Sequence, residues 1–343
     1  MAGRGIRGLA RLCSRPLGQR KRYLFSLGLL TVCSSQLLPG ALPQRSFATC
    51  PPTSGGSTFG SSKPLRASWV VGAGVAYPTG DFSFKVFQPF PKVLAAEIVD
   101  PFLMCDEWGA SQKEMGVPAQ DPGAPVNAGE RHVGWHPHRG FDILSYVKEG
   151  RGRHADSLGN LATVRPGGIQ WMRTGSGVEH AEGGGNPEGA NQHGFQIWIN
   201  LPSGLKMSEP QYGSVQPEDI PEVRSAGGGL SRLLAGPGAA AFEDREGVHI
   251  ADCELPPRSS HTHRVPVDAD TLLVYVYRGQ GSVAGHNLRP QQAALFEATA
   301  DQPLDSVLLE LQAGEEGLGA LIFAGRQLKE PIAWEAGLGT AVV

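Results

Sequence analysis

From Trp69 onward the chain alternates short apolar runs with clusters of turn-forming residues. The runs are rich in β-branched and aromatic residues, which favour strands. Gly, Pro, Asn and Asp separate them, as expected where strands are joined by tight turns. The clearest runs are FDILSYV, NLATVR, GFQIWINL, TLLVYVYRG, SVLLELQ and GALIFAG. No long stretch shows the 3.6-residue period of an amphipathic helix, so the pattern predicts an all-β chain.

The predicted strands fall into two groups, at about residues 82–200 and 230–330, with a polar, turn-rich connection at 201–229. Each group has the strand content of one small barrel or sandwich. LSYVKEGRGRHAD in the first group and LVYVYRGQGSVAG in the second share a strand, a turn of the form [ER]G-x-G and a second strand. We therefore expect two copies of one barrel fold, at residues 69–205 and 206–343.

Length and composition agree with this organisation. The 343 residues allow two domains of about 150 residues each. Glycine accounts for 47 residues, roughly twice its usual share of about 7%, as many tight turns require.

Residues 1–68 differ from the rest of the chain. Residues 1–80 contain ten Lys or Arg and no acidic residue, and Ser, Thr, Gly and Pro accumulate after residue 50. This composition is typical of a disordered transit peptide and predicts a chloroplast or mitochondrial address, with cleavage before about residue 68. The alternatives are a tail without an address on a cytoplasmic protein, or a secretory signal around YLFSLGLLTV. That run is shorter than the ~20 residues of a membrane span, so no membrane association is expected.

The charge and the cysteines exclude other classes. Without its basic leader the chain carries 20 basic and 33 acidic residues, a net charge of −13. Such a surface gives a nucleic-acid backbone nothing to bind. Five cysteines are scattered without a CxxC or Cys-His spacing, and only Cys105 and Cys253 lie in the body. They predict neither a disulfide framework nor a thiolate metal site.

Two short motifs carry the candidate chemistry. HPHRGFD places His136 and His138 two residues apart, and HAE does the same for His180 and Glu182. In extended backbone, residues i and i+2 point to the same side, so each pair can converge on one point. Three imidazoles and one carboxylate suit Fe(II), Mn(II), Ni(II) or Zn(II) and leave coordination positions for water, O₂ or a chelating substrate. On spacing alone, histidines in surface loops explain the pattern equally well.

The blocks around these motifs carry a family resemblance. PFLMCDEWG, HPHRGFDILSYVKEG, HADSLGN, RPGGIQWMRTGSGVEHAE, GFQIWINLP, KMSEPQY and AGRQLKEPI occur in order across most of residues 81–332. Together they resemble the pirin family. The resemblance implies a cupin-superfamily bicupin: two tandem double-stranded β-helix barrels, with one metal, most often iron, in the first and none in the second. The family's ligands correspond to His136, His138, His180 and Glu182.

Some nearby residues have less certain roles. Asp142 stands where the family usually has Glu; it is a competitor to Glu182 as a ligand, or else lies behind the ligands or faces outward. Gln196 is expected to point inward and hold a water or the substrate near the metal. His154 and Asp156 are interpreted as turn residues. His132 and His193 are interpreted as surface residues. His261 and His263 repeat the HxH spacing, but no HxE follows, so no second site is predicted.

The resemblance implies two functions. In the first, the protein is a quercetin 2,3-dioxygenase-like enzyme: a flavonol or similar aromatic chelates the metal, loses a proton to Glu182 and reacts with O₂. In the second, it is a non-enzymatic, iron- and redox-dependent partner of transcription factors or signalling proteins. The open coordination positions favour the enzyme, and the leader argues against a nuclear partner. A bicupin with an empty site is the third alternative. We expect a monomer.

Overall fold

The computed structural model describes residues 65–76, 86–109, 131–185, 192–266, 268–297 and 308–334. Residues 1–64, which hold most of the predicted leader, lie outside the described residues. The last residues assigned to the leader belong to the folded part: Leu65 is buried in the core of the second barrel, and a strand begins at Ala67. Any cleavage that preserves this packing must therefore fall before Leu65.

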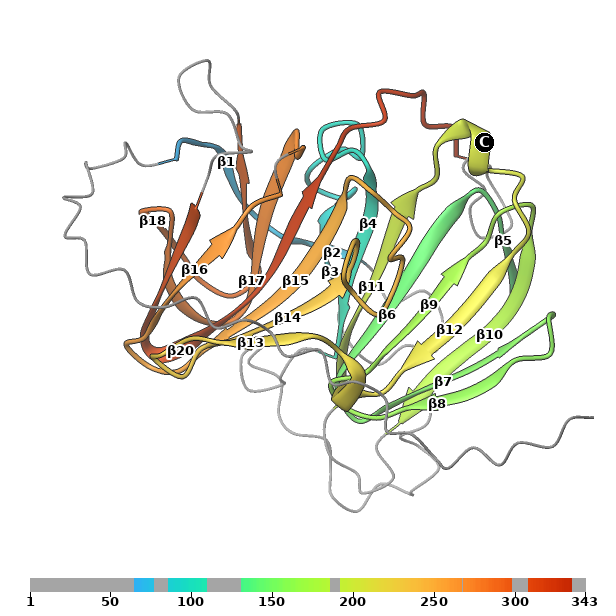
Figure 1. Cartoon of the computed structure of the whole chain (residues 1–343), viewed down its shortest axis with the longest axis horizontal. Helices are drawn as coiled ribbons and strands as arrows, with labels where there is room; N and C mark the ends of the chain where they lie inside the picture. Colours follow the sequence, from blue (N-terminus) through green and yellow to red (C-terminus); the bar gives the residue numbers. More distant parts are fainter. Residues whose placement is uncertain are drawn as a thin grey trace, which may run out of the picture. The chain divides into compact units, whose positions relative to one another are not determined.

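The described chain is all-β, as predicted (Figure 1). Its only helical segments are two 3₁₀ turns, Ser203–Leu205 and Pro217–Asp219. No helix in the described ranges is long and apolar enough to cross a membrane.

The first barrel is formed by a seven-stranded and a four-stranded sheet. The larger sheet has the order β12-β9-β6-β11-β4-β3-β2, and the smaller has the order β5-β10-β7-β8. The strands are β2 (Gly74–Ala76), β3 (Val86–Phe90), β4 (Phe102–Trp108), β5 (Arg131–His138), β6 (Phe141–Glu149), β7 (Arg151–Asp156), β8 (Leu161–Val164), β9 (Ile169–Arg173), β10 (Val178–Gly185), β11 (His193–Asn200) and β12 (Gln211–Val215).

The second barrel is one continuous nine-stranded sheet, because two of its strands are long enough to run through both faces. These are β17 (Thr271–Val283) and β20 (Leu308–Gly325). The other strands are β1 (Ala67–Gly72), β13 (Glu222–Arg224), β14 (Leu230–Ala235), β15 (Val248–Leu255), β16 (Ser260–Arg264), β18 (His286–Leu288) and β19 (Gln292–Phe296).

The two barrels repeat the same strand order. The main path β1-β19-β17-β20-β15-β14-β13 corresponds strand by strand to β12-β9-β6-β11-β4-β3-β2. On the opposite face, β16, β20, β17 and β18 pair in the order of β5, β10, β7 and β8. The predicted pair of double-stranded β-helix barrels is confirmed, and the likeness between the two [ER]G-x-G segments marks equivalent strands.

The outermost strands are exchanged between the halves. β1, which precedes the first barrel in the chain, pairs with β19 of the second barrel. β12, which follows the first barrel and lies beyond the predicted boundary at residue 205, pairs with β9 of the first. Sheet membership therefore departs from the predicted ranges 69–205 and 206–343 at both ends.

The period-two alternation of β6 and β11 gives the seven-stranded sheet two buried faces. On β6, Phe141 and Ile143 face the interior of the first barrel, whereas Leu144 and Tyr146 belong to a core shared with the second barrel. That shared core also contains Leu273, Tyr275 and Phe323 of the second barrel, among many others. Apolar burial between the sheets therefore joins the two halves.

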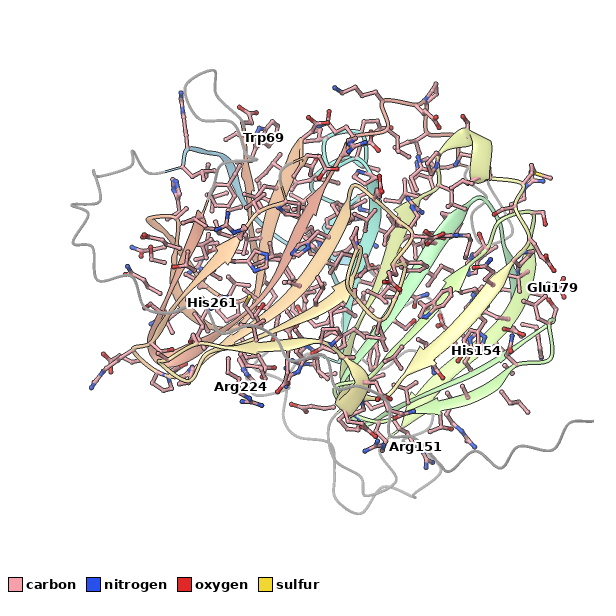
Figure 2. All side chains as sticks on the ribbon, in the orientation of Figure 1. Trp69, Arg151, His154, Glu179, Arg224 and His261 are labelled. Atoms are coloured by element: carbon pink, nitrogen blue, oxygen red, sulfur yellow. The ribbon has the colours of Figure 1, made fainter. Side chains whose placement is uncertain are left out.

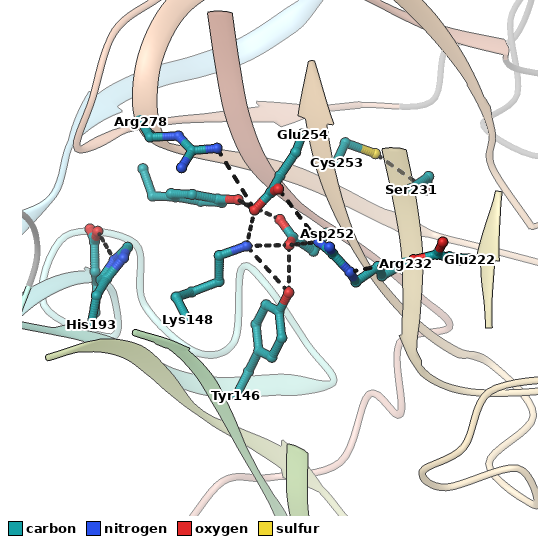
Figure 3. Close-up of polar contacts among 12 residues, drawn as sticks. Tyr146, Lys148, His193, Glu222, Ser231, Arg232, Asp252, Cys253, Glu254 and Arg278 are labelled. Atoms are coloured by element: carbon teal, nitrogen blue, oxygen red, sulfur yellow. Dashed lines mark hydrogen bonds and ion pairs between the residues drawn. The ribbon is translucent and has the colours of Figure 1, made fainter. Parts of the chain in front are cut away.

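A buried polar network lies within this interface (Figure 3). Asp252 on β15 accepts hydrogen bonds from Tyr146 at 2.6 Å, from Lys148 at 2.7 Å and from Tyr277 at 2.7 Å. Lys148 also pairs with Glu254. Burial opposes ionisation of Asp252, but Lys148 and the tyrosine hydroxyls outweigh it, so that its pKa lies below the ordinary value.

We expect Asp252→Asn to lower the free energy of unfolding by about 1–3 kcal/mol, because Lys148 loses its fully buried counter-charge and keeps only the partly exposed Glu254. Urea unfolding measures the change. The matched control is Glu315→Gln, which breaks the pair with Arg258 on the surface (side chains 69% and 75% exposed) and is expected to cost about 0–1 kcal/mol. Equal, small losses in the two variants would contradict a supporting role for this network.

Candidate metal centre and adjoining cavity

Three of the four predicted ligands converge. β5 and β10 pair antiparallel, with His136 opposite His180 and His138 opposite Val178. The donor nitrogens of the three histidines all lie within 4.8 Å of one another. Nε2 of His180 is 2.9 Å from Nε2 of His136. The i, i+2 geometry thus places both HPH imidazoles on one side of β5, and the sheet register brings His180 to them.

The hydrogen bond of His136 to the backbone leaves one of its nitrogen lone pairs facing this cluster. Nδ1 of His136 lies 2.7 Å from the carbonyl oxygen of Gly134, so the ring proton is placed there and Nε2 is left as an acceptor. Metal-binding histidines commonly hold their second ring nitrogen in this way. Burial, reinforced by His138 and His136, lowers the pKa of His180 to about 2, so its imidazole is neutral at pH 7.

Glu182 lies beside the three histidines but outside their 4.8 Å group. A bulge between His180 and Glu182 shifts its register, and Glu182 is opposite Val133 on β5 and His154 on β7. Burial raises the pKa of Glu182, and His136 and a hydrogen bond from Gln196 offset only part of this rise. Gln196 points inward, as predicted, and its amide holds the Glu182 carboxylate.

Asp106 is a second carboxyl group that the sequence interpretation did not single out. It lies on β4 opposite Gln196, on the inward side of the sheet, and accepts a hydrogen bond from Gln88. Burial raises the pKa of Asp106 to about 6, with a further contribution from the nearby Glu182. The alternation in FLMCDEW could have indicated this position. Asp106 lies on the same side of the strand as Met104, and its two neighbours in the chain point to the opposite side.

His154 does not lie in a turn. It is a buried residue of β7, stacked on Tyr212 at 4.2 Å between ring centroids and 5.4 Å from the ring of His180. Asp156, at the end of that strand, does serve a turn: it accepts hydrogen bonds from the backbone of Leu158 and from Asn160, as well as from His154 at 3.0 Å. The alternation of inward and outward side chains along β7 therefore determines the position of His154, although turn-forming residues surround it in the sequence.

A small cavity of about 10 Å³ adjoins the cluster. Apolar and aromatic side chains form one part of its wall, and polar groups form the rest. Its lining residues are Ile143, Ser145, His154, Gln170, Trp171, Met172, His180, Glu182 and Tyr212. His154 is labelled in Figure 2, within the first barrel.

Asp142 is not near the histidines. Its side chain is fully buried on the other face of β6, where it accepts hydrogen bonds from Arg173 and from Arg245 of the second half. Burial raises the pKa of Asp142 to about 6, although both arginines oppose this. Asp142 therefore takes the outward-facing alternative and joins the halves. His193 is buried beside Glu107, at 2.8 Å, and is not a surface residue; the side chain of His132 lies outside the described residues.

Comparison with known proteins supports the same family. The Pirin family model matches residues 83–199. A pirin-like protein of Caulobacter vibrioides is 32% identical over 244 residues, which are 70% of this chain and 80% of that protein. The chain belongs to the pirin family. A Pseudomonas aeruginosa protein whose name proposes a quercetin 2,3-dioxygenase is 36% identical to this pirin over 245 residues, 69% of this chain and 79% of the relative.

Two solved structures share the fold of this pirin. A quercetin 2,3-dioxygenase from Acinetobacter baumannii is 28% identical, with a TM-score of 0.64 over 82% of this chain and 92% of the other. The bacterial pirin YhhW from Escherichia coli, solved in complex with nickel(II), is 18% identical, with a TM-score of 0.54 over 76% and 99%. At that identity, the second likeness concerns the fold.

The stability of the metal-free pirin should fall with pH below about 6.5. The unfolded chain protonates His180 near its ordinary pKa of 6.5, whereas the folded protein does so only near pH 2. Stability is therefore lost as the pH falls through this window, by about 1.4 kcal/mol per pH unit for one such group. Urea midpoints at several pH values, with a chelator present, measure this slope. His180→Gln should flatten it; parallel curves would contradict a neutral His180.

Proposed function

We propose that this pirin is an iron-dependent dioxygenase of the quercetinase type, which oxidises a flavonol or a similar chelating aromatic compound with O₂. The carrying observation is the convergence of three imidazoles beside a carboxylate and a partly apolar cavity. The names of the Pseudomonas and Acinetobacter relatives support the choice of substrate class.

The donor set fits a divalent transition metal. Nε2 of His136 and Nε2 of His180 lie 2.9 Å apart, and Nδ1 of His180 has no hydrogen-bond partner among the described residues. His136, His138, His180 and Glu182 would hold the ion. Imidazole and carboxylate donors suit Fe(II), which we propose, and also Zn, Mn or Ni. When bound, the ion would supply Lewis acidity and open coordination positions.

Glu182 is the proposed base. Its carboxylate, held by Gln196, would accept the proton of the flavonol hydroxyl. A raised pKa brings a carboxylate closer to the pKa of the group it deprotonates, which makes it a more effective base near neutral pH.

The cavity sets the size of what can enter. Its volume of about 10 Å³ is enough for roughly one water molecule and far below the roughly 300–1,000 Å³ of most ligand sites. A flavonol would therefore enter only if the lining side chains move. Trp171 and Met172 would then form the apolar surface, and Ser145 and Gln170 the polar contacts.

We expect His136→Ala to lose most of its bound iron and its flavonol-dependent O₂ uptake while keeping its far-ultraviolet circular dichroism. Metal analysis and an oxygen electrode, with a panel of flavonols, give the two readouts. His286→Gln, in the second barrel, is the matched control and should retain both. Iron-loaded wild-type protein that consumes no O₂ with any flavonol would contradict the enzyme and favour the regulatory, metal-dependent binding protein.

We expect Glu182→Gln to reduce the rate per bound iron by about 10²–10⁴-fold, the usual contribution of a general base. The amide keeps an oxygen that can bind a metal but cannot accept the hydroxyl proton. Dividing the O₂-uptake rate by the iron content separates the loss of a base from the loss of a ligand. A rate per iron equal to wild type would show that Glu182 is not the base.

A further inference from the structure

The second barrel contains its own group of metal-binding side chains. β16 occupies the position of β5 in the repeated strand order, so His261 and His263 correspond to His136 and His138. The partner strand differs: His261 and His263 lie opposite Leu311 and Leu309 of β20, where the first barrel offers His180 and Val178. The second barrel therefore lacks the HAE half of the first site.

β15 supplies donors instead. Sγ of Cys253 and the ring nitrogens of His261 and His263 all lie within 4.8 Å of one another. Nε2 of His249 lies 2.9 Å from Nε2 of His263. His249 and Cys253 lie four residues apart on β15, so the period of two sends both into the barrel interior.

The surroundings of this group are apolar. Cys253 is fully buried within the core of the second barrel, and His263 is 8% exposed beside it. Burial lowers the pKa of His249 to about 4 and that of His263 to about 3, so both imidazoles are neutral and offer lone pairs at pH 7. The thiol of Cys253 has a 3.4 Å contact with Ser231 (Figure 3), a weak hydrogen bond.

We propose that Cys253, His261 and His263 bind a second metal ion, of the zinc class, with His249 as the fourth donor. Thiolate and imidazole donors in a four-coordinate site suit Zn²⁺. Binding would replace the thiol proton of Cys253 by the ion and release that proton to solvent. The site does not depend on the proposed oxidation. The sequence predicts a second barrel without a metal and no thiolate metal site, and this proposal departs from both predictions.

The second ion would have a structural role. β15 pairs with β14 and β20, whereas β16 pairs with β20, so no ladder joins β15 to β16 directly. Ligands from both strands would connect the two faces of the barrel through the ion. Closed sites with four protein ligands are typical of structural zinc. His261 is labelled in Figure 2, within the second barrel.

Cobalt(II) is the probe that separates the two sites. A thiolate ligand to Co²⁺ gives a charge-transfer band in the near ultraviolet, and the first site has no cysteine. The full-length metal-free protein, titrated with Co²⁺, should show this band and take up a second equivalent beyond the one at the first site. The band should persist in His136→Ala, which makes the result independent of the proposed enzyme.

Cys253→Ser should abolish the band and lower the cobalt or zinc content by one equivalent. The controls are Cys105→Ser, at the other buried cysteine of the described chain, and a variant with Cys13, Cys33 and Cys50 all replaced by serine. If Cys253→Ser does not fold, His261→Gln, at a half-buried position, tests the same site. Absence of the band in wild type, its persistence in Cys253→Ser, or an unchanged cobalt affinity of this site in His261→Gln would overturn the proposal.

Discussion

Burial of the seven-stranded sheet on both faces is the constraint on which the rest of the structure depends. Alternate residues of β6 and β11 point into the first barrel or into the core shared with the second. A polar side chain buried on these strands cannot rely on bulk water and needs a partner inside the protein. Asp142 finds Arg173 and Arg245 on one face, and Gln196 finds Glu182 on the other.

Local patterns identified much of the fold and the site. The period of two in FDILSYV and GFQIWINL and the i, i+2 pair HPH depend only on neighbouring residues, and the structure keeps them. A bulge interrupts the HAE pair and leaves Glu182 outside the group of three histidines. Features that depend on distant pairing were not visible in the sequence. The outermost strands β1 and β12 are exchanged between the barrels, and β1 pairs with residues more than 200 positions away. No local rule predicts such pairing.

The incorrect predictions for individual residues have the same cause, which is pairing between distant parts of the chain. His154 was assigned to a turn because Gly and Asp surround it, but its strand pairing places it against Tyr212. Asp106 was passed over because a lone carboxyl has no motif; its proximity to Glu182 follows from the β4–β11 register. Cys253 has no metal-ligand spacing with HTH, and only the curvature of the barrel brings it to His261 and His263.

The duplication explains why the barrels diverge in chemistry while keeping their topology. Strand order is fixed by backbone hydrogen bonds and apolar alternation, which tolerate changes at single inward positions. The first barrel uses these positions for Asp106, Gln196 and Glu182, whereas the second fills most of them with Ala, Val, Leu and Ile. The orientation of Glu182 nevertheless depends on both halves. Gln196 holds its carboxylate, and the neighbours of Gln196 on β11, Phe195 and Ile197, are packed in the shared core. We therefore expect a change in that core to reach the hydrogen bond between Gln196 and Glu182 through β11.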